Sequence, residues 1–194
     1  MENTTELVEN RTLSMHPKKF ALWLFIVSVI MIFAAWTSAY IVRRAEGNWL
    51  EFDLPPAMLY STIIIAFSSI SMHWAFISAK KDNLNQIKIG LLITVILGAV
   101  FVYLQYISFS QLIDNQVWFG GKKSNPAGSF VYVLAGAHAV HIIGGALFLL
   151  ITLYYSFANE VHSKKLLLID MCTTFWHFLD VLWIYLYVFL MLYR

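Results

Sequence analysis

The sequence predicts an all-α membrane protein, a bundle of five transmembrane helices. Sixty per cent of its 194 residues are hydrophobic and only 12% are charged, whereas an average soluble domain carries about 25% charged residues. The charged residues lie mainly between five long apolar runs, which is the pattern of a polytopic membrane protein. Each run can cross a hydrocarbon layer of about 30 Å as a helix, and none shows the alternation of a barrel strand.

Charged residues, prolines or polar loops bound each expected helix. The first run follows a lysine pair and ends before an arginine pair, and the second follows two prolines. Residues 1–19 are expected to form a polar cytoplasmic tail without a cleavage site, and residues 20–194 a single membrane domain. The expected helices are residues 20–42, 57–79, 89–113, 127–158 and 166–193.

Lysine and arginine residues favour one orientation in the membrane. Eight of the thirteen belong to the tail and to the loops at 80–88 and 158–165, which would share one side, and five belong to the other side. Cytoplasmic segments carry an excess of these residues. We therefore expect a cytoplasmic N-terminus and an external, periplasmic C-terminus, with the first span as the insertion signal.

Bulk charge and cysteine content exclude several classes of protein. The net charge is +2 and no basic patch with interleaved aromatic residues occurs, so no nucleic-acid partner is expected. Cys172 is the single cysteine, which excludes an internal disulfide and a cysteine metal cluster. The sequence shows no nucleophile–base pair, phosphate-binding loop or carboxylate dyad, so no catalytic residue is expected.

Ionisable residues within the spans gather in the last two helices. His138 and His141 are three residues apart and share a face, and Asp170, His177 and Asp180 form one stripe on the last helix. At a rise of 1.5 Å per residue, His138 and His177 each lie about 16 Å from opposite membrane surfaces. We therefore expect a polar clasp of these five residues, in which His138 or His141 hydrogen-bonds His177 or Asp180.

Haem ligation and proton transfer are two other roles that these side chains could have. Paired intramembrane histidines could ligate haem, but Asp180 would then place a carboxylate beside the porphyrin. A proton or ion path would use the same residues, but the first and third helices offer no ionisable group to extend it. A zinc or copper site is not expected, because the ligands form no compact cluster.

The same residues carry a resemblance to a known family. Residues 176–183 read WHFLDVLW, which closely resembles the Trp-His-Phe-x-Asp-x-x-Trp signature of the last helix of cytochrome c oxidase subunit III. Residues 136–145 read GAHAVHIIGG and resemble that family's Gly-x-His-x-x-His-x-x-Gly-Gly helix. Gln105 and the opening segment 16–25 also fit, and five helices match the shorter bacterial form.

The resemblance implies a non-catalytic subunit of a respiratory oxidase. Subunit III is thought to stabilise subunit I and its proton uptake, and to hold phospholipids in a cleft between its first two helices and the remaining bundle. Oxygen reduction and proton pumping occur in subunit I, so haem and copper are expected in partner subunits and none in this chain. Candidate lipid neighbours, from side-chain type and depth, are Trp23, Trp36, Arg43, Arg44 and His73.

Two positions depart from the family pattern. Val29 stands where many members carry Glu in the first helix, and Ser108 stands where many carry Glu after the glutamine that matches Gln105. Asp170 occupies a place where the family often has an acid. Val29 counts against proton delivery through this chain and favours a supporting role, because docking and lipid binding need no acid there.

Partners and location follow from the same resemblance. The expected partners are oxidase subunits I and II and membrane lipids, with a larger respiratory supercomplex containing the electron-donating complex as a further assembly. The expected location is the bacterial inner membrane, as a multi-pass protein. The alternatives are the third subunit of a quinol oxidase or nitric oxide reductase and, from a different class, a stand-alone transporter or proton relay built on Asp180 and the histidines.

Overall fold

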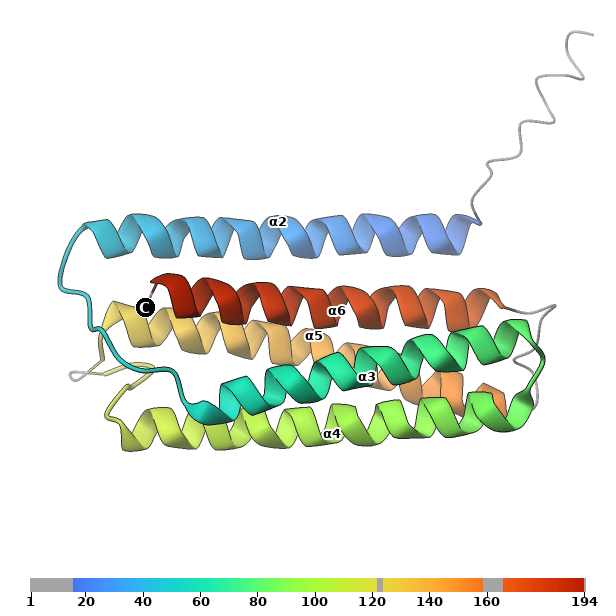
Figure 1. Ribbon diagram of the computed structural model, residues 1–194. Coiled ribbons are helices and arrows are strands. Elements are labelled where there is room, and N and C mark those ends of the chain that lie inside the picture. Colours follow the sequence, from blue (N-terminus) through green and yellow to red (C-terminus); the bar gives the residue numbers. More distant parts are fainter. Residues whose placement is uncertain (1–15, 122–123, 159–165, 194) are drawn as a thin grey trace, which may run out of the picture.

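Five long helices make up the part of the chain that the structure, a computed structural model, describes: residues 16–121, 124–158 and 166–193. All five are long and apolar enough to cross a membrane, as the apolar runs predicted. They are drawn in Figure 1 as α2 (Pro17–Ala45), α3 (Pro56–Lys80), α4 (Leu84–Asp114), α5 (Pro126–Phe157) and α6 (Leu167–Tyr193).

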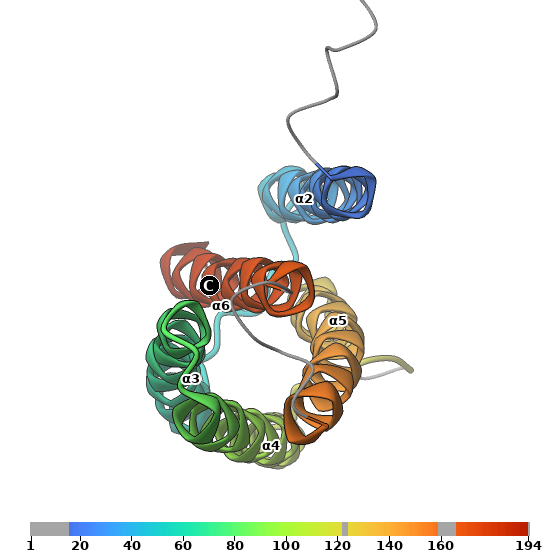
Figure 2. The same ribbon diagram turned by 90° about the vertical axis from the view of Figure 1, so that its right-hand side faces the viewer.

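Four helices form a ring and the fifth lies outside it. Neighbours contact each other in the order α3, α4, α5 and α6, and α6 closes the ring against α3. Figure 2 shows this ring end-on, with α2 on its outer side. Among the described helices, α2 contacts α5 and α6 only, so its lateral support is weaker than that of the ring helices.

Capping residues explain why the helices begin before the apolar runs do. Proline occupies the first turn of α2, α3 and α5, where its missing N–H costs nothing. The side chain of Asn83 accepts a hydrogen bond from the backbone N–H of Gln86 at 3.4 Å. Helix α4 therefore starts at Leu84, although its polar first turn delays the hydropathy signal to residue 89.

The loops are short. Only some of the lysine and arginine residues on which the expected orientation rests lie in the part of the chain that the structure describes. Successive helices run in opposite directions, so the turn between α3 and α4 lies at the same end as the start of α2 (Figure 1). Residues 1–15 of the expected tail, the lysines at 122–123 and 164–165, and Arg194 lie outside the described residues. The orientation of the termini stays a prediction.

Helices α3 and α4 pack together most extensively, and Gly90 permits their close approach. A Cβ atom at this position would lie 2.9 Å from the Cβ of Ala75 and 3.2 Å from its Cα. Small residues at such contacts let backbones approach closely, which supplies van der Waals contact where the hydrophobic effect is absent. Asp82, at a φ of 54°, completes the tight turn that joins the two helices.

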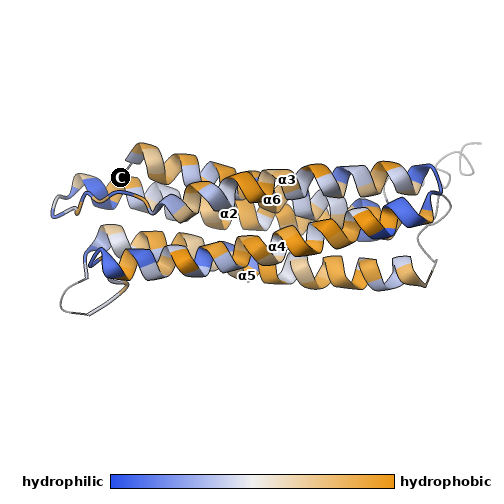
Figure 3. Ribbon diagram, turned by 60° about the horizontal axis from the view of Figure 1, so that its bottom comes forward, coloured by the Kyte–Doolittle hydropathy of each residue, from blue (hydrophilic) through white to orange (hydrophobic). Residues whose placement is uncertain are grey.

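The surface of the bundle is mostly apolar along the middle of the helices. Figure 3 shows hydrophobic colour there and hydrophilic colour at the turns. Met31, Ile70, Val140 and Val181 are each between 65% and 67% exposed. Exposed large apolar side chains in this number suit a lipid environment, while the buried core holds both aliphatic and aromatic residues.

Replacing Gly90 by leucine should destabilise the fold by about 1–3 kcal/mol, the usual cost of overpacking. The new side chain would collide with the backbone of α3, which cannot yield as a flexible side chain can. The matched control is Gly144→Leu, since a Cβ at Gly144 meets nothing within 4 Å. Unfolding by SDS in mixed micelles, followed by circular dichroism, measures both; equal losses would contradict the close-approach argument.

Candidate functional site

Hydrogen bonds join α6 to α3 inside the bundle. The indole Nε1 of Trp176 donates to Oγ of Ser68 at 3.0 Å, and Nε1 of Trp183 donates to Oγ1 of Thr62 at 3.0 Å. Both tryptophans are 1% exposed. A buried N–H without an acceptor costs free energy, most of all where no water can replace it. These two bonds therefore fix the rotation of α6 against α3.

A group of polar side chains lies beside these bonds, and we call it the α3–α6 polar cluster: Ser69, His73, His177 and Asp180. Oγ of Ser69 and Nδ1 of His177 form a hydrogen bond of 2.6 Å. The rings of His73 and His177 have centroids 5.8 Å apart. The side chain of His177 is 31% exposed and His73 is exposed, so the cluster opens on the outer surface of the bundle.

Asp180 is the buried member of this cluster. It is 2% exposed, and neither carboxylate oxygen has a hydrogen-bond partner among the described residues. Its Oδ2 lies 4.0 Å from Nδ1 of His177, one turn earlier on the same helix. A carboxylate at this depth costs about 3 kcal/mol on insertion scales. The hydroxyl of Ser69 is a further polar neighbour of this carboxylate, although no contact among the described residues reaches hydrogen-bond geometry.

His138 lies inside the ring and is covered by aromatic rings. It is 1% exposed, and neither ring nitrogen has a hydrogen-bond partner among the described residues. Its ring centroid is 5.1 Å from that of Trp183 and 6.1 Å from that of Phe101. His138 therefore acts as a packing side chain between α4, α5 and α6.

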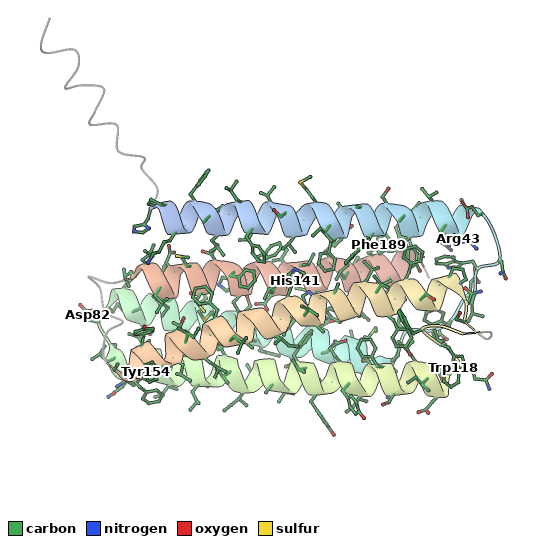
Figure 4. The ribbon with its side chains drawn as sticks, turned by 180° about the vertical axis from the view of Figure 1, so that it is seen from behind. Arg43, Asp82, Trp118, His141, Tyr154 and Phe189 are labelled. Atoms are coloured by element: carbon green, nitrogen blue, oxygen red, sulfur yellow. The ribbon has the colours of Figure 1, made fainter. Side chains whose placement is uncertain are left out.

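His141 faces α2 instead. Its Nδ1 donates to the carbonyl oxygen of Ala137 in its own helix at 2.7 Å. The rings of Phe25 and Phe33 lie 6.4 Å and 5.7 Å from it, centroid to centroid. Figure 4 shows His141 midway along the bundle. These ring contacts pack the middle of α2 against α5.

The structure does not form the hydrogen bond that was expected from His138 or His141 to His177 or Asp180. Two residues three apart on a helix share a broad face, but their directions still differ by about 60°. His138 consequently enters the ring while His141 meets α2. On α6, His177 turns to α3 and bonds a serine that the expected clasp did not include.

Asp170 lies apart from the other expected clasp residues, near the start of α6. Its Oδ2 forms an ion pair with Nζ of Lys19 at 2.5 Å, and the two side chains are 27% and 31% exposed. At the opposite end of α2, the hydroxyl of Tyr40 donates to the carbonyl oxygen of Tyr193 at 3.2 Å. Polar contacts therefore fasten α2 to α6 at both ends.

The arrangement suits helix packing better than redox chemistry. Among the described residues, no group of three or more His, Cys, Asp or Glu is placed to hold a metal ion. His138, His141 and His177 each face a different neighbour, and aromatic rings occupy the space beside the first two. These described histidines therefore do not fit a shared haem.

Sequence reasoning missed the serines of α3. Ser61 accepts a hydrogen bond from Nε2 of Gln105 at 2.7 Å, and the hydroxyls of Ser71 and Thr94 lie 2.6 Å apart. A signal was present, because serines recur along α3 at spacings of seven and ten residues that place them on one face. That buried or half-buried face consists of Ser61, Ser68, Ser71 and Ser78.

Comparison with known proteins identifies the family. The chain matches the family model of cytochrome c oxidase subunit III over residues 4–194. The chain belongs to this family. Its members are the third subunits of haem–copper oxidases, and the resemblance seen in the two histidine-containing helices is confirmed. The chain is thus a multi-pass membrane protein of a family that works within multi-subunit oxidases.

Curated relatives include both quinol and cytochrome c oxidase subunits. The cytochrome bo(3) ubiquinol oxidase subunit 3 of Buchnera aphidicola subsp. Baizongia pistaciae is 30% identical over 182 residues, which cover 88% of this chain and 89% of that one. Cytochrome c oxidase subunit 3 of Spodoptera frugiperda is 34% identical over 140 residues, covering 71% and 87%. The Rattus norvegicus subunit is 29% identical over 184 residues, covering 88% and 67%.

The two departures from the subunit III pattern are both buried. Val29 is 1% exposed and lies one turn from each of Phe25 and Phe33, whose rings flank His141. An acid at position 29 would lie on the face of α2 that meets this histidine; here the contact is apolar. Ser108 is fully buried, and its hydroxyl has no hydrogen-bond partner among the described residues.

Grooves on both sides of α2 replace the cleft that the resemblance placed beside the first two helices. Helix α3, the second helix, belongs to the ring. Of the first two helices, therefore, only α2 lines these grooves, and α6 or α5 forms the opposite wall. The groove between α2 and α6 measures about 560 Å³ and is mainly apolar, with Thr37 and Tyr185 in its wall. The groove between α2 and α5 measures about 730 Å³ and includes Arg43 and Ser129 in its wall.

The five expected lipid neighbours have different surroundings. Arg43 lines the α2–α5 groove and pairs with Glu46 at 3.2 Å, and Arg44 beside it is half-buried. Trp23 is 45% exposed on α2, and Trp36 packs edge-on against Phe33. His73 belongs to the α3–α6 polar cluster instead. Of the five, only Arg43 lines one of these two grooves.

Replacing Ser69 by alanine should cost about 0.6 kcal/mol of stability and at most about 1.7, the measured range for such hydrogen bonds between membrane helices. The bond it removes joins α3 to α6 through His177. Ser28→Ala is the control, since Ser28 bonds only the carbonyl of Leu24 in its own helix. SDS unfolding measures both variants, and an equal effect would show that the bond does not join the helices.

The Lys19–Asp170 pair should contribute a coupling energy of about 0.2–1 kcal/mol, because both side chains are partly exposed and solvent screens them. Lys19→Met, Asp170→Asn and the double variant form the double-mutant cycle. Arg43 and Glu46 pair within one segment of chain and give a second cycle that does not join two helices. A coupling near zero in the first cycle would mean that the ion pair does not fasten α2.

Proposed function

We propose that this chain is the non-catalytic subunit III of a respiratory cytochrome c oxidase, where it stabilises subunit I and its proton uptake and holds phospholipids. Oxygen reduction coupled to proton pumping then takes place in subunit I. One observation carries the proposal: within this subunit III chain, the intramembrane tryptophans and His177 bond hydroxyls of a neighbouring helix. In the described part of the chain, no group of three or more His, Cys, Asp or Glu is placed to hold a metal ion.

A rigid ring with a loosely attached outer helix suits a supporting subunit. Bonds between side chains of α3 and α6 hold the ring, and polar contacts near its ends hold α2. A rigid apolar surface can hold a neighbouring membrane subunit in one arrangement without contributing a reacting group. Such support would keep the proton-uptake route of subunit I intact over many turnovers.

Phospholipid binding is supported by the grooves beside α2. Lipid chains suit the mainly apolar α2–α6 groove. A headgroup phosphate suits the end of the α2–α5 groove if it displaces Glu46, which also lines the groove and pairs with Arg43 at 3.2 Å. Figure 4 shows Arg43 at this end of α2. Lipids held there would fill the spaces that α2 leaves against the ring.

The proposed setting is the bacterial inner membrane, with the N-terminus in the cytoplasm. Five helices, a short polar tail and the distribution of lysine and arginine support it. The proposed partners are oxidase subunits I and II and membrane lipids, and the electron-donating complex where a supercomplex forms. Haem and copper belong to the partner subunits in this proposal.

A quinol oxidase is the second candidate for the parent enzyme, because relatives of both kinds are similarly close. The chain is 30% identical to the ubiquinol oxidase subunit from Buchnera and 34% identical to the cytochrome c oxidase subunit from Spodoptera. The electron donor reacts on other subunits, so the two candidates share every property proposed for this chain. The spectrum and donor preference of the purified complex distinguish them.

Purification through a tag on this chain tests the proposal. In mild detergent, haem absorbance and oxygen consumption should co-purify with the chain, and phospholipid should appear in native mass spectra of the complex. The isolated chain should carry neither haem nor oxidase activity, because His138, His141 and His177 face separate neighbours. Haem kept by the isolated chain, or a chain purified without other oxidase subunits, would overturn the proposal.

Removing the chain supplies the matched functional test. A complex stripped of it should begin to consume oxygen at a near-normal rate and then lose activity over repeated turnovers. Re-addition of the chain should restore the lifetime. Immediate loss of proton pumping in an Asp180→Asn complex that assembles normally would favour the relay alternative instead.

A further inference from the structure

The α3–α6 polar cluster opens outward at a depth where lipid would surround it. We propose that this opening docks a transmembrane helix of the neighbouring oxidase subunit, which presents a hydrogen-bonding side chain to His73 and His177. The inference rests on the proposed function, because it needs a partner subunit in the membrane. It assigns the interface to one side of the ring, the outer face where α3 meets α6.

Depth makes the exposure of these histidines costly. His73 lies seven residues before the end of α3, about 10 Å along the helix. His177 lies ten residues after the start of α6, about 15 Å along it. A helix of 25 residues exceeds the hydrocarbon layer by only a few ångströms at each end. Both imidazoles therefore lie within that layer.

The cluster has hydrogen-bonding capacity that the described residues do not use. Nδ1 of His177 is engaged by Ser69, which leaves its Nε2 for another group. His73 contacts the ring of His177 but makes no hydrogen bond within the described chain. Behind them the carboxylate of Asp180 lies 4.0 Å from Nδ1 of His177 and has no hydrogen bond among the described residues. Polar side chains of one membrane helix are satisfied by those of another.

Other faces of the bundle do not share this property. The outer faces of α4 and α5 expose apolar residues and tyrosines, including Tyr103, Tyr106 and Val140. His141 on α5 is covered by the rings of α2. The polar cluster, by contrast, has an exposed apolar neighbour on α3: Ile70 is 65% exposed and lies three residues before His73, on the same side of the helix. Apolar area around a few polar groups is the composition of a specific interface between membrane helices.

Photo-crosslinking in the intact oxidase tests the location. A crosslinking amino acid at position 70 should join this chain to a larger oxidase subunit. Position 140 is the control: Val140 is 67% exposed, and it lies as far from the start of α5 as Ile70 lies from the start of α3. Position 140 should give lipid adducts only.

Substitutions test the chemistry of the contact. His73→Phe should reduce retention of the chain on the oxidase in detergent by roughly 3- to 18-fold, the range from an average to the strongest measured hydrogen bond between membrane helices. His73→Gln should restore much of the retention, because the amide can donate and accept. His141→Phe serves as the control, since α2 covers that histidine. His73 is exposed and makes only a ring contact with His177 among the described residues, so SDS unfolding of both variants separates a loss of docking from a loss of stability.

The outcomes separate this inference from the function it rests on. Crosslinks from position 70 to a second copy of this chain, or to lipid alone in an intact complex, would overturn the docking site and leave the proposed function standing. Crosslinks to the partner from position 140 and none from position 70 would do the same. A chain that never co-purifies with haem would overturn both.

Discussion

Hydrogen bonds between the tryptophans of α6 and the hydroxyls of α3 are the interaction on which the rest of the bundle depends. Within hydrocarbon a polar group finds no water, so each donor must meet an acceptor in the protein. Two indoles bonded to one neighbour leave α6 a single rotation. That rotation places His177 at the α3 side and turns Tyr185 towards α2.

The two sides of α6 differ in what holds them. Towards α3, hydrogen bonds deep in the bundle make the contact specific and rigid. Towards α2, the polar contacts lie nearer the helix ends, and aromatic rings from both helices meet between them, as Phe25 meets Phe175. Grooves of about 560 and 730 Å³ flank α2 as a result. The tryptophan–hydroxyl bonds do not involve α2, so in the proposed function lipid fills those grooves without disturbing the polar interior.

The helices could be predicted from the sequence because hydrophobicity is a local property. An apolar run of about 20 residues is long enough to cross the membrane as a helix. Sequence reasoning also found the motif residues, but it paired them incorrectly. The spacing of His138 and His141 shows that they share a face, yet it does not show which helix that face meets. The order of the helices in the ring and the outer position of α2 decide which helix each histidine meets. The spacing of residues along one helix predicts neither of these. Serines of α3 were passed over because single hydroxyls often bond their own helix, as Ser28 does.

Asp180 brings these arguments together. Its carboxylate is 98% buried in a chain that gives it no hydrogen bond among the described residues. For the chain alone, an apolar side chain of similar volume would be more favourable there. An acid at this position is less costly in the assembled complex. A side chain of a second subunit that hydrogen-bonds His177 would extend the hydrogen-bond network that lies beside Asp180. A buried acid that is costly in the isolated subunit would then favour assembly with the other, since it lacks a hydrogen bond only while the subunits are apart. Subunit III would in this way be selected for its complex rather than for its own stability.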